Sequence, residues 1–252
     1  MKYLQIDKLD FVYPGKPLFF EASMKICAGD IVGLLGPNGS GKTTLFDVIC
    51  GIKPDTHNKI INRFHNHLYL SQTLTTPHTL RMFDIFKMVT LLSSPHPPTQ
   101  DAVIEKLQHW CPEIIPRYRD IWDKKCSICS YGEKRWFFTV TLLTLDSDLI
   151  ILDEPTAGVD PEFRHYIWRC LKAAAEEGKA ILVSSHNIDE VANNCDHFYM
   201  ISGKSLISFN SGAEFKQYYR ASSLDEAFIH AAAAPDINLC CAQTSAQSAA
   251  SR

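Results

Sequence analysis

The chain has 252 residues, of which 46% are hydrophobic and 21% are charged, and its formal net charge is −3. This length allows one large α/β domain, or one domain with a small subdomain. The slightly acidic balance argues against nucleic acid as a partner, because nucleic-acid-binding proteins usually carry a basic surface. No apolar stretch reaches the roughly 18 to 20 residues of a membrane helix. The start carries an acid at Asp7 where a secretory signal needs an apolar run, so we expect the chain to stay in the cytosol.

Short strand-like runs come first along the chain. They cover Leu4–Leu9, Phe11–Tyr13 and Leu18–Cys27, and Pro14–Gly15 is predicted to form a turn between them. The next run, Ile31–Leu35, is wholly apolar, which is typical of a strand buried on both faces of a parallel sheet.

The segment after that strand fits the P-loop pattern of Gly, four residues and Gly-Lys-Thr. Glycines let the backbone curl so that successive N–H groups face phosphate oxygens, and a helix predicted over Lys42–Cys50 adds its positive end. Lys42 would supply a charge for the β- and γ-phosphates of ATP, and the Thr43 hydroxyl a ligand for Mg²⁺. A chance glycine-rich turn is the alternative, but the strand before and the helix after argue against it. The candidate nucleotide-binding residues here are Gly36, Pro37, Asn38, Gly39, Ser40, Gly41, Lys42, Thr43 and Thr44.

The middle of the chain has a strand-like run at Leu68–Leu70, followed by helical spacing of apolar residues. We expect a helical subdomain over about 79–145, inserted into a sheet domain that covers 1–234. The residues of 235–252 are mainly Ala, Ser and Gln, which predicts a disordered tail. Cys126 and Cys129 have metal-ligand spacing, but no second pair completes four ligands, so we do not expect zinc.

The parallel α/β pattern resumes with an apolar strand over Leu149–Leu152, which delivers Asp153 and Glu154 at its end. Asp153 is suited to the Mg²⁺ shell, and Glu154 to polarising a water for attack on the γ-phosphorus. A solvated acidic turn is the alternative, and the presence of a P-loop favours the functional interpretation. A helix over Pro161–Glu177 and a strand over Ala180–Ser184 follow.

Between these motifs lies Cys129-Ser130-Tyr131-Gly132-Glu133, and its place resembles that of the signature Leu-Ser-Gly-Gly-Gln of ABC (ATP-binding cassette) ATPases. Cys, Tyr and Glu differ from that signature, whereas Ser130 and Gly132 match the two positions that approach phosphate in the family. The same residues also predict a capping box that starts a helix over Tyr131–Thr144. Both interpretations can hold, because a capped helix start is itself an anion site.

The resemblance implies roles for two further polar residues. Gln72 ends a strand at the position of the family's Q-loop glutamine, where it would touch Mg²⁺ and the attacking water and couple the site to a transmembrane partner. Alternatively it is an ordinary polar strand end. His186 follows the strand over Ala180–Ser184, as the family's switch histidine does, and would contact the γ-phosphate and orient Glu154.

Two more positions match the family pattern. Asp160 follows Pro155-Thr156-Ala157-Gly158-Val159 and resembles the D-loop aspartate, although it also fits a simple helix N-cap before Pro161. Tyr13 matches the aromatic residue that stacks on adenine, and a tyrosine packed on the surface is the alternative. The short interval between Lys42 and Gln72 indicates a trimmed antiparallel edge.

The resemblance covers about residues 2–232 and implies an α/β P-loop NTPase of the ABC type. We expect a mostly parallel core sheet with helices, an N-terminal antiparallel β subdomain and the inserted helical subdomain. The expected function is ATP hydrolysis that drives membrane transport. The segment Leu224–Phe228 is similar to the last helix of exporter cassettes. The expected partners are transmembrane permease subunits and a second cassette, which would hold the chain at the cytoplasmic face of the membrane.

A soluble ABC ATPase of the iron–sulfur assembly type is the alternative function. DNA-repair members of the family insert a long coiled coil between the two motifs, and this chain has neither the length nor the heptads for one.

Overall fold

A computed structural model describes residues 2–13, 16–55, 59–93 and 96–234 of the chain. The predicted turn at Pro14–Gly15 and the predicted tail at 235–252 lie outside the described residues. The chain forms two compact units. Unit 1 comprises residues 1–3, 27–31 and 63–185, and unit 2 comprises residues 4–26, 32–62 and 186–252. Each unit is described by itself below.

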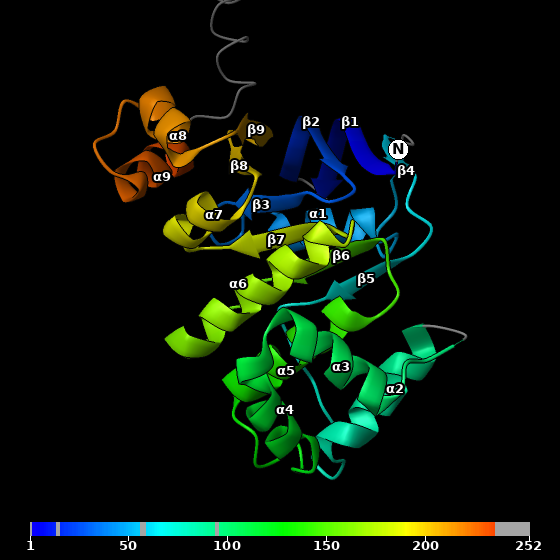
Figure 1. The fold of residues 1–252 in the computed structure, drawn as a ribbon. Coiled ribbons are helices and arrows are strands. Elements are labelled where there is room, and N and C mark those ends of the chain that lie inside the picture. The colour runs from blue at the N-terminus through cyan, green and yellow to red at the C-terminus, as the bar shows by residue number, and fades with distance from the viewer. Residues whose placement is uncertain (1, 14–15, 56–58, 94–95, 235–252) are drawn as a thin grey trace, which may run out of the picture. The chain divides into compact units, whose positions relative to one another are not determined.

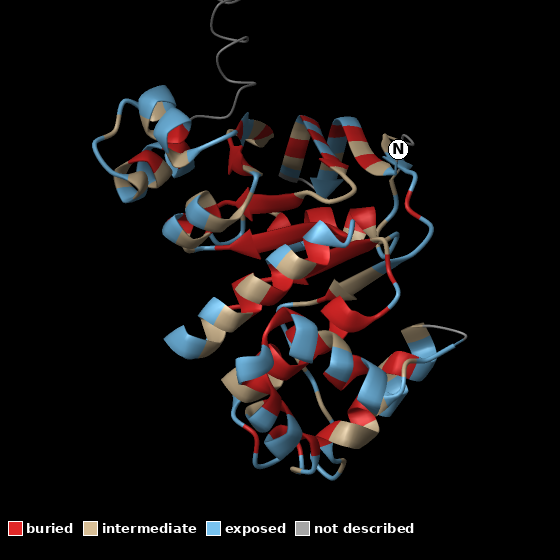
Figure 2. Ribbon diagram, viewed as in Figure 1, coloured by how far each residue is buried: buried red, intermediate tan, exposed pale blue. Residues whose placement is uncertain are grey.

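Unit 1 contains three parallel strands in the order β5, β6, β7. These strands are β5 (His67–Leu70), β6 (Leu149–Asp153) and β7 (Ala180–Ser185). Every residue of β6 and β7 is buried, as Figure 2 shows, which agrees with their unbroken apolar runs. The register pairs Asp153 with Ser184, so the acidic end of β6 lies beside a serine of β7.

The helices of unit 1 pack on and beside these strands (Figure 1). They are α2 (Met82–Ser93), α3 (Gln100–Trp110), the short 3₁₀ helix η1 (Pro112–Ile114), α4 (Ile115–Trp122), α5 (Tyr131–Thr144) and α6 (Pro161–Glu176). From Arg135 to Thr144 every residue of α5 is buried. This helix contacts β5, β6 and α6, so its start is fixed against the strands that carry the predicted acids.

Unit 2 contains an antiparallel sheet in the order β2, β1, β4 and a second group in which β3 pairs parallel with β8 and β8 antiparallel with β9. The strands are β1 (Tyr3–Tyr13), β2 (Lys16–Cys27), β3 (Ile31–Leu35), β4 (Ile60–Asn62), β8 (His197–Ser202) and β9 (Ser205–Phe209). With the helices of both units, this mixture of parallel and antiparallel strands confirms the predicted fold class.

One prediction for the first sheet is wrong. The runs Leu4–Leu9 and Phe11–Tyr13 form one strand, β1, rather than two. Lys8 has a φ of 52°, so the strand kinks there without ending, and Glu21 of β2 has a φ of 45°. At the kink the Lys8 N–H donates to Ser23 Oγ and the Glu21 N–H donates to Asp10 Oδ1. Side-chain oxygens therefore replace backbone partners where the ladder is irregular.

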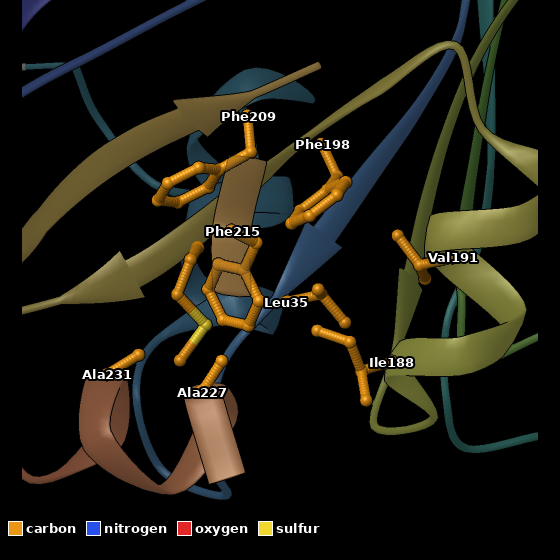
Figure 3. Packing of buried hydrophobic residues seen from close by; sticks show 9 residues of the cluster. Leu35, Ile188, Val191, Phe198, Phe209, Phe215, Ala227 and Ala231 are labelled. Carbon is orange, nitrogen blue, oxygen red and sulfur yellow. The ribbon is translucent and has the colours of Figure 1, made fainter. Parts of the chain in front are cut away.

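The helices of unit 2 are α1 (Lys42–Ile49), α7 (Ile188–Asn194), α8 (Gly212–Tyr219) and α9 (Leu224–Ala232). A core cluster joins β3, β8 and β9 to α7, α8 and α9. In Figure 3 Phe215 of α8 lies between the strand residues Phe198 and Phe209 and the alanines of α9, and its ring centroid is 4.9 Å from that of Phe209. These aromatic contacts hold α8 on the strands, while α7 and α9 contribute buried aliphatic side chains to the same cluster.

Among the described residues, no helix combines the length and the hydropathy that are needed to cross a lipid bilayer.

Candidate functional site

The predicted P-loop lies in unit 2, between the buried strand β3 and helix α1. Gly41 is the N-cap of α1 with a φ of 107°, and Gly39 has a φ of 78°. Both values lie in the left-handed region that side chains with a Cβ rarely adopt. At Gly36 an added Cβ would lie 2.5 Å from Ser40 Oγ. The loop can therefore take this curled path only with glycine at these positions.

Lys42 and Ser40 show how the P-loop is prepared for a ligand. The residue Lys42 is 8% exposed. Its ammonium donates hydrogen bonds to Gly36 O at 2.7 Å and to Pro37 O at 3.3 Å. Ser40 Oγ is buried and has no hydrogen-bond partner among the described residues. A buried hydroxyl without a partner is costly unless a ligand supplies one. A charged amine, a hydroxyl and the N–H groups of a helix start fit the phosphate groups of a nucleotide.

Tyr13, the residue predicted to stack on adenine, contacts the first turn of α1. The Tyr13 hydroxyl shares a hydrogen bond of 3.3 Å with the Thr44 hydroxyl, and the residue is 40% exposed. Thr43 is exposed at the second position of α1. Lys53 forms an ion pair with Asp47 of α1, and the hydrogen bond to Asp47 raises the pKa of Lys53. Tyr13 thus presents an accessible ring, and its stacking on adenine stays a prediction.

The two predicted acids lie in unit 1, at the end of β6. Asp153 is 1% exposed, and its Oδ1 accepts a hydrogen bond of 2.5 Å from the Ser184 hydroxyl. The same hydroxyl oxygen accepts the Glu154 N–H at 3.0 Å. Because a hydroxyl both donates and accepts, one serine fixes the side chain of one acid and the backbone of the next. Sequence reasoning missed Ser184, although its place at the end of β7 was a signal.

Glu154 and Gln72 contact each other. Gln72 Nε2 donates to Glu154 Oε2 at 3.3 Å, so the predicted Q-loop glutamine and the predicted base share a hydrogen bond. Glu154 has a φ of 52°, a left-handed conformation that is strained for a residue with a Cβ. Its backbone oxygen accepts from Arg135 Nε of α5 at 3.1 Å. Sequence reasoning also missed Arg135, because nothing near it in the chain indicates these contacts.

The start of α5 forms the predicted capping box. Ser130 Oγ accepts the Glu133 N–H at 3.1 Å, and Glu133 Oε2 accepts the Ser130 N–H at 2.8 Å. Glu133 also forms an ion pair with Arg117 of α4. An acid in place of the family's glutamine is therefore accommodated by a cation on a neighbouring helix and by the helix dipole.

Gly132 and Gly158 bring the signature segment against the predicted D-loop. An added Cβ at Gly132 would lie 2.3 Å from Gly158 O, and one at Gly158 would lie 3.2 Å from the ring of Tyr131. Asp160 occupies the N-cap position of α6 with Pro161 after it, but its side chain makes no capping hydrogen bond. The predicted N-cap position of Asp160 before Pro161 is therefore confirmed, without a side-chain capping contact, and its role as a D-loop aspartate stays a prediction.

A pocket of about 560 Å³ opens at this end of unit 1. It brings Ser130, Gly132 and Asp160 together at the starts of two helices, α5 and α6. We call it the signature pocket. Its lining residues are Arg117, Ile121, Ser130, Tyr131, Gly132, Glu133, Trp136, Gly158, Val159, Asp160 and Phe163.

The predicted site residues thus form two clusters in unit 1, and the others lie in unit 2. Unit 1 brings Asp153, Glu154 and Gln72 together, and a second cluster holds Ser130, Gly132 and Asp160. Unit 2 carries Tyr13, the residues of the P-loop, and His186, which is exposed directly after β7.

The cysteines with metal-ligand spacing are buried. Burial raises the pKa of both Cys126 and Cys129, and Cys126 Sγ lies 3.4 Å from Met82 Sδ of α2. Raised pKa values keep thiols protonated and therefore poor metal ligands.

Two features define this protein as a P-loop NTPase. A buried strand leads through a P-loop into a helix, and a second buried strand ends in acidic residues beside a parallel strand. Comparison with known proteins shows to which family of P-loop NTPases the chain belongs. A family model described as ABC transporter matches residues 19–157, more than half of the chain, and an AAA-domain model matches residues 127–192.

The curated relatives and solved structures agree with the first of these models. Protein McbF of Escherichia coli is 31% identical over 221 residues, which span 85% of this chain and 88% of McbF. The lipopolysaccharide export system ATP-binding protein LptB of Escherichia coli (strain K12) is 29% identical over 232 residues, spanning 86% of this chain and 94% of LptB. A solved ATP-binding subunit of an ABC transporter has a TM-score of 0.76 at 20% identity and covers 90% of this chain and 98% of that one.

The chain therefore belongs to the ABC transporter family. It is an ATP-binding subunit with ATPase activity that serves transport, as predicted from the sequence.

Proposed function

We propose that the P-loop holds the phosphates of ATP and that Glu154 is the general base for hydrolysis. The observation that carries this proposal is the P-loop itself, where a buried lysine and an unpartnered serine hydroxyl lie at the start of a helix. Tyr13 would stack on adenine, and His186 would contact the γ-phosphate.

The acids of unit 1 suit different tasks. Asp153 is held by Ser184 with its carboxylate at the end of β6, and together with Thr43 and Gln72 it would bind Mg²⁺, whose charge stabilises charge on phosphate oxygens. Glu154 Oε2 accepts a hydrogen bond from Gln72 Nε2. An ionised carboxylate next to an amide is the arrangement that a base for water activation needs.

We propose further that two cassettes complete each other's ATP sites. Ser130 is exposed at the start of α5, where its backbone and the helix dipole favour an anion. The signature pocket would receive the γ-phosphate end of a nucleotide held by the P-loop of a second cassette. Closure would then take its free energy from the binding of two nucleotides.

Unit 1 also offers a surface for the permease. An apolar groove of about 330 Å³ lies between β5, α2 and α5, and it is lined by Ile85, Val89, Leu92 and Phe138 among others. Beside it α2 exposes Met88 and Leu91, which are 49% and 64% accessible. Exposed apolar side chains around a groove are typical of protein interfaces. We propose that a cytoplasmic helix of a transmembrane subunit binds here and that Gln72, which follows β5, passes the state of the ATP site to it.

Transport is favoured over the alternative of a soluble ABC ATPase. The relative LptB is named as part of an export system, and the match spans 86% of this chain and 94% of LptB. We propose export as the direction, and the chain would act at the cytoplasmic face of the membrane through its permease.

The shared site can be tested with Glu154→Gln, which keeps the shape of the side chain and removes its basicity. This variant should bind ATP, fail to hydrolyse it and sediment as a dimer when ATP is present. In the Glu154→Gln background, Ser130→Arg should leave the binding of ATP to the single chain intact but keep the protein monomeric.

Two outcomes would contradict the proposal. Wild-type turnover by Glu154→Gln would show that another group activates the water. Equal dimerisation with and without Ser130→Arg would show that the signature segment does not face the second nucleotide. Lys42→Ala in the same background serves as the control, which should bind ATP far more weakly and should not dimerise at ATP concentrations that saturate the Glu154→Gln protein.

A further inference from the structure

Arg135 is a fully buried cation in the second turn of α5. Its guanidinium donates to three backbone carbonyl oxygens. Nη1 contacts Ser71 O at 2.5 Å and Gln72 O at 3.3 Å, while Nε contacts Glu154 O at 3.1 Å. One side chain thus holds two segments, the end of β5 and the end of β6, that carry the proposed glutamine and the proposed base.

The burial of Arg135 is energetically unusual. Among the described residues no carboxylate lies within ion-pairing distance of it, and its buried Nη2 has no hydrogen-bond partner there. Burial lowers the pKa of Arg135, while the charges of Asp153 and Glu154 act in the opposite direction. A buried charge without an ion pair costs stability, and an apolar residue of similar volume is often more stable. A contribution to stability therefore does not explain why an arginine occupies this position.

The contacts of Arg135 occur where the backbone is strained. Glu154 has the left-handed φ of 52°, and this strained conformation sets the direction of its carbonyl group. The Gln72 carbonyl accepts a second hydrogen bond, of 2.8 Å, from the Tyr131 hydroxyl. The planar guanidinium of arginine holds its carbonyl acceptors at fixed angles, whereas the ammonium of lysine rotates and does not fix their directions.

We propose that Arg135 is a positioning residue for ATP hydrolysis. It fixes the separation of Gln72 and Glu154 and stabilises the left-handed backbone of Glu154, so that the Gln72 amide and the Glu154 carboxylate meet at the water to be activated. This inference rests on the proposed roles of Gln72 and Glu154. Arg135 does not touch nucleotide in this assignment, and its effect passes through the two residues that it holds.

The test compares Arg135→Met with Lys179→Met. Lys179 is a matched control because it is also a buried cation that donates to backbone carbonyls, at Leu145 O and Ser147 O beyond the other end of α5. Both variants should change the melting temperature. Only Arg135→Met should lower kcat, by about 10- to 100-fold, which is the range that small misplacements of reacting groups produce. The Kd for ATP should stay unchanged, because the P-loop does not depend on Arg135.

Two further variants sharpen the result. Arg135→Lys keeps the charge but not the fork, so its kcat should lie between those of wild type and Arg135→Met. In a Gln72→Ala background, Arg135→Met should cause a much smaller further loss of kcat, because residues that act as a unit are not additive. If Arg135→Met does not fold, Tyr131→Phe replaces it, since this exposed residue loses only its hydrogen bond to Gln72 O and should lower kcat severalfold.

The inference is overturned if the folded Arg135→Met protein keeps the wild-type kcat, if Lys179→Met loses kcat to the same extent, or if Arg135→Met weakens ATP binding while kcat stays unchanged. Should Arg135→Met not fold, a wild-type kcat for Tyr131→Phe has the same meaning. Failure of the proposed function gives a different result, because Gln72→Ala and Glu154→Gln would then retain turnover themselves.

Discussion

Two buried lysines illustrate how the same side chain serves different purposes in this protein. Lys42 and Lys179 are each 8% exposed and each donates to two backbone carbonyl oxygens. The Lys42 contacts lie within its own loop, so a phosphate can replace them with little change elsewhere. Those of Lys179 connect α6 and β7 to the end of α5, so they stabilise the unit.

Lys42→Ala should reduce the affinity for ATP by on the order of 100-fold, because it removes a charge-assisted hydrogen bond from the phosphates. Titration with a fluorescent ATP analogue measures this change. Lys179→Met should bind the analogue as the wild type does. Normal ATP hydrolysis by Lys42→Ala would disprove the assignment of the P-loop.

The stability of the protein should depend on pH through Lys179. Burial lowers the pKa of Lys179 to about 8 from its ordinary 10.5. Between these values the unfolded chain holds the proton that the folded chain has released, so the contribution of Lys179 to the free energy of unfolding should rise with pH. Relative to Lys179→Met, the wild type should gain on the order of 2 kcal/mol from pH 8 to pH 10.5. Urea unfolding at several pH values measures this difference, and a flat or falling difference would contradict it.

At the scale of elements, the start of α5 combines several interactions in one short segment. Its capping box satisfies the N-terminal N–H groups, Glu133 pairs with Arg117 of α4, and Gly132 lies against Gly158 O. The tight glycine contact fixes where the signature segment and the predicted D-loop meet. Any residue with a Cβ at position 132 has to displace the backbone at Gly158.

Gly132→Ala should therefore destabilise the protein by about 1 to 3 kcal/mol and reduce turnover, because the displaced atom is a backbone oxygen. Gly212→Ala is the matched control. There an added Cβ would lie 3.0 Å from Leu224 Cδ2, the end of a flexible side chain, and 3.2 Å from Ala192 Cβ, so no neighbour is as close as the backbone oxygen that faces Gly132. Thermal unfolding and turnover of the two variants test the prediction. Equal and small changes in stability and turnover for the two variants would show that the backbone at Gly158 can move to accommodate the added Cβ.

How much the sequence could predict depends on the distance between partners along the chain. The P-loop, the capping box at Ser130 and the strand of Asp153 are set by residues a few positions apart, and all three are present as predicted. The contacts of Arg135 and Ser184 join segments that are far apart in sequence. Their positions follow from strand register and helix packing, which no local pattern encodes. The kink at Lys8 was missed because its stabilising oxygen, on Ser23, belongs to the next strand.

At the scale of the whole molecule, the apolar groove of unit 1 is the proposed contact with a membrane partner. Leu92 of α2 lines this groove and is 86% exposed, so a change there hardly affects folding. Beside it Met88 and Leu91 of the same helix are also apolar although they are exposed, and this has no benefit for a protein that acts alone.

Leu92→Asp should release the chain from membranes in cells that also make its permease, because a charge in an apolar interface is costly. Its ATPase activity in isolation should stay unchanged. Ile229→Asp, at a position on α9 that is 64% exposed and outside the groove, is the control. Sedimentation of membrane fractions followed by immunodetection measures the bound share. Equal membrane binding by both variants would place the permease contact elsewhere.

The two units are interleaved along the chain, and this has a consequence for synthesis on the ribosome. Strand β3 consists of five buried apolar residues, and its partner within unit 2, β8, begins only at His197. At usual translation rates, β3 leaves the ribosome about ten seconds or more before β8. Over that time an apolar strand edge stays available to other nascent chains and to chaperones. From the order of the strands we therefore expect the yield of this protein in cells to depend on the speed of translation and on chaperone supply.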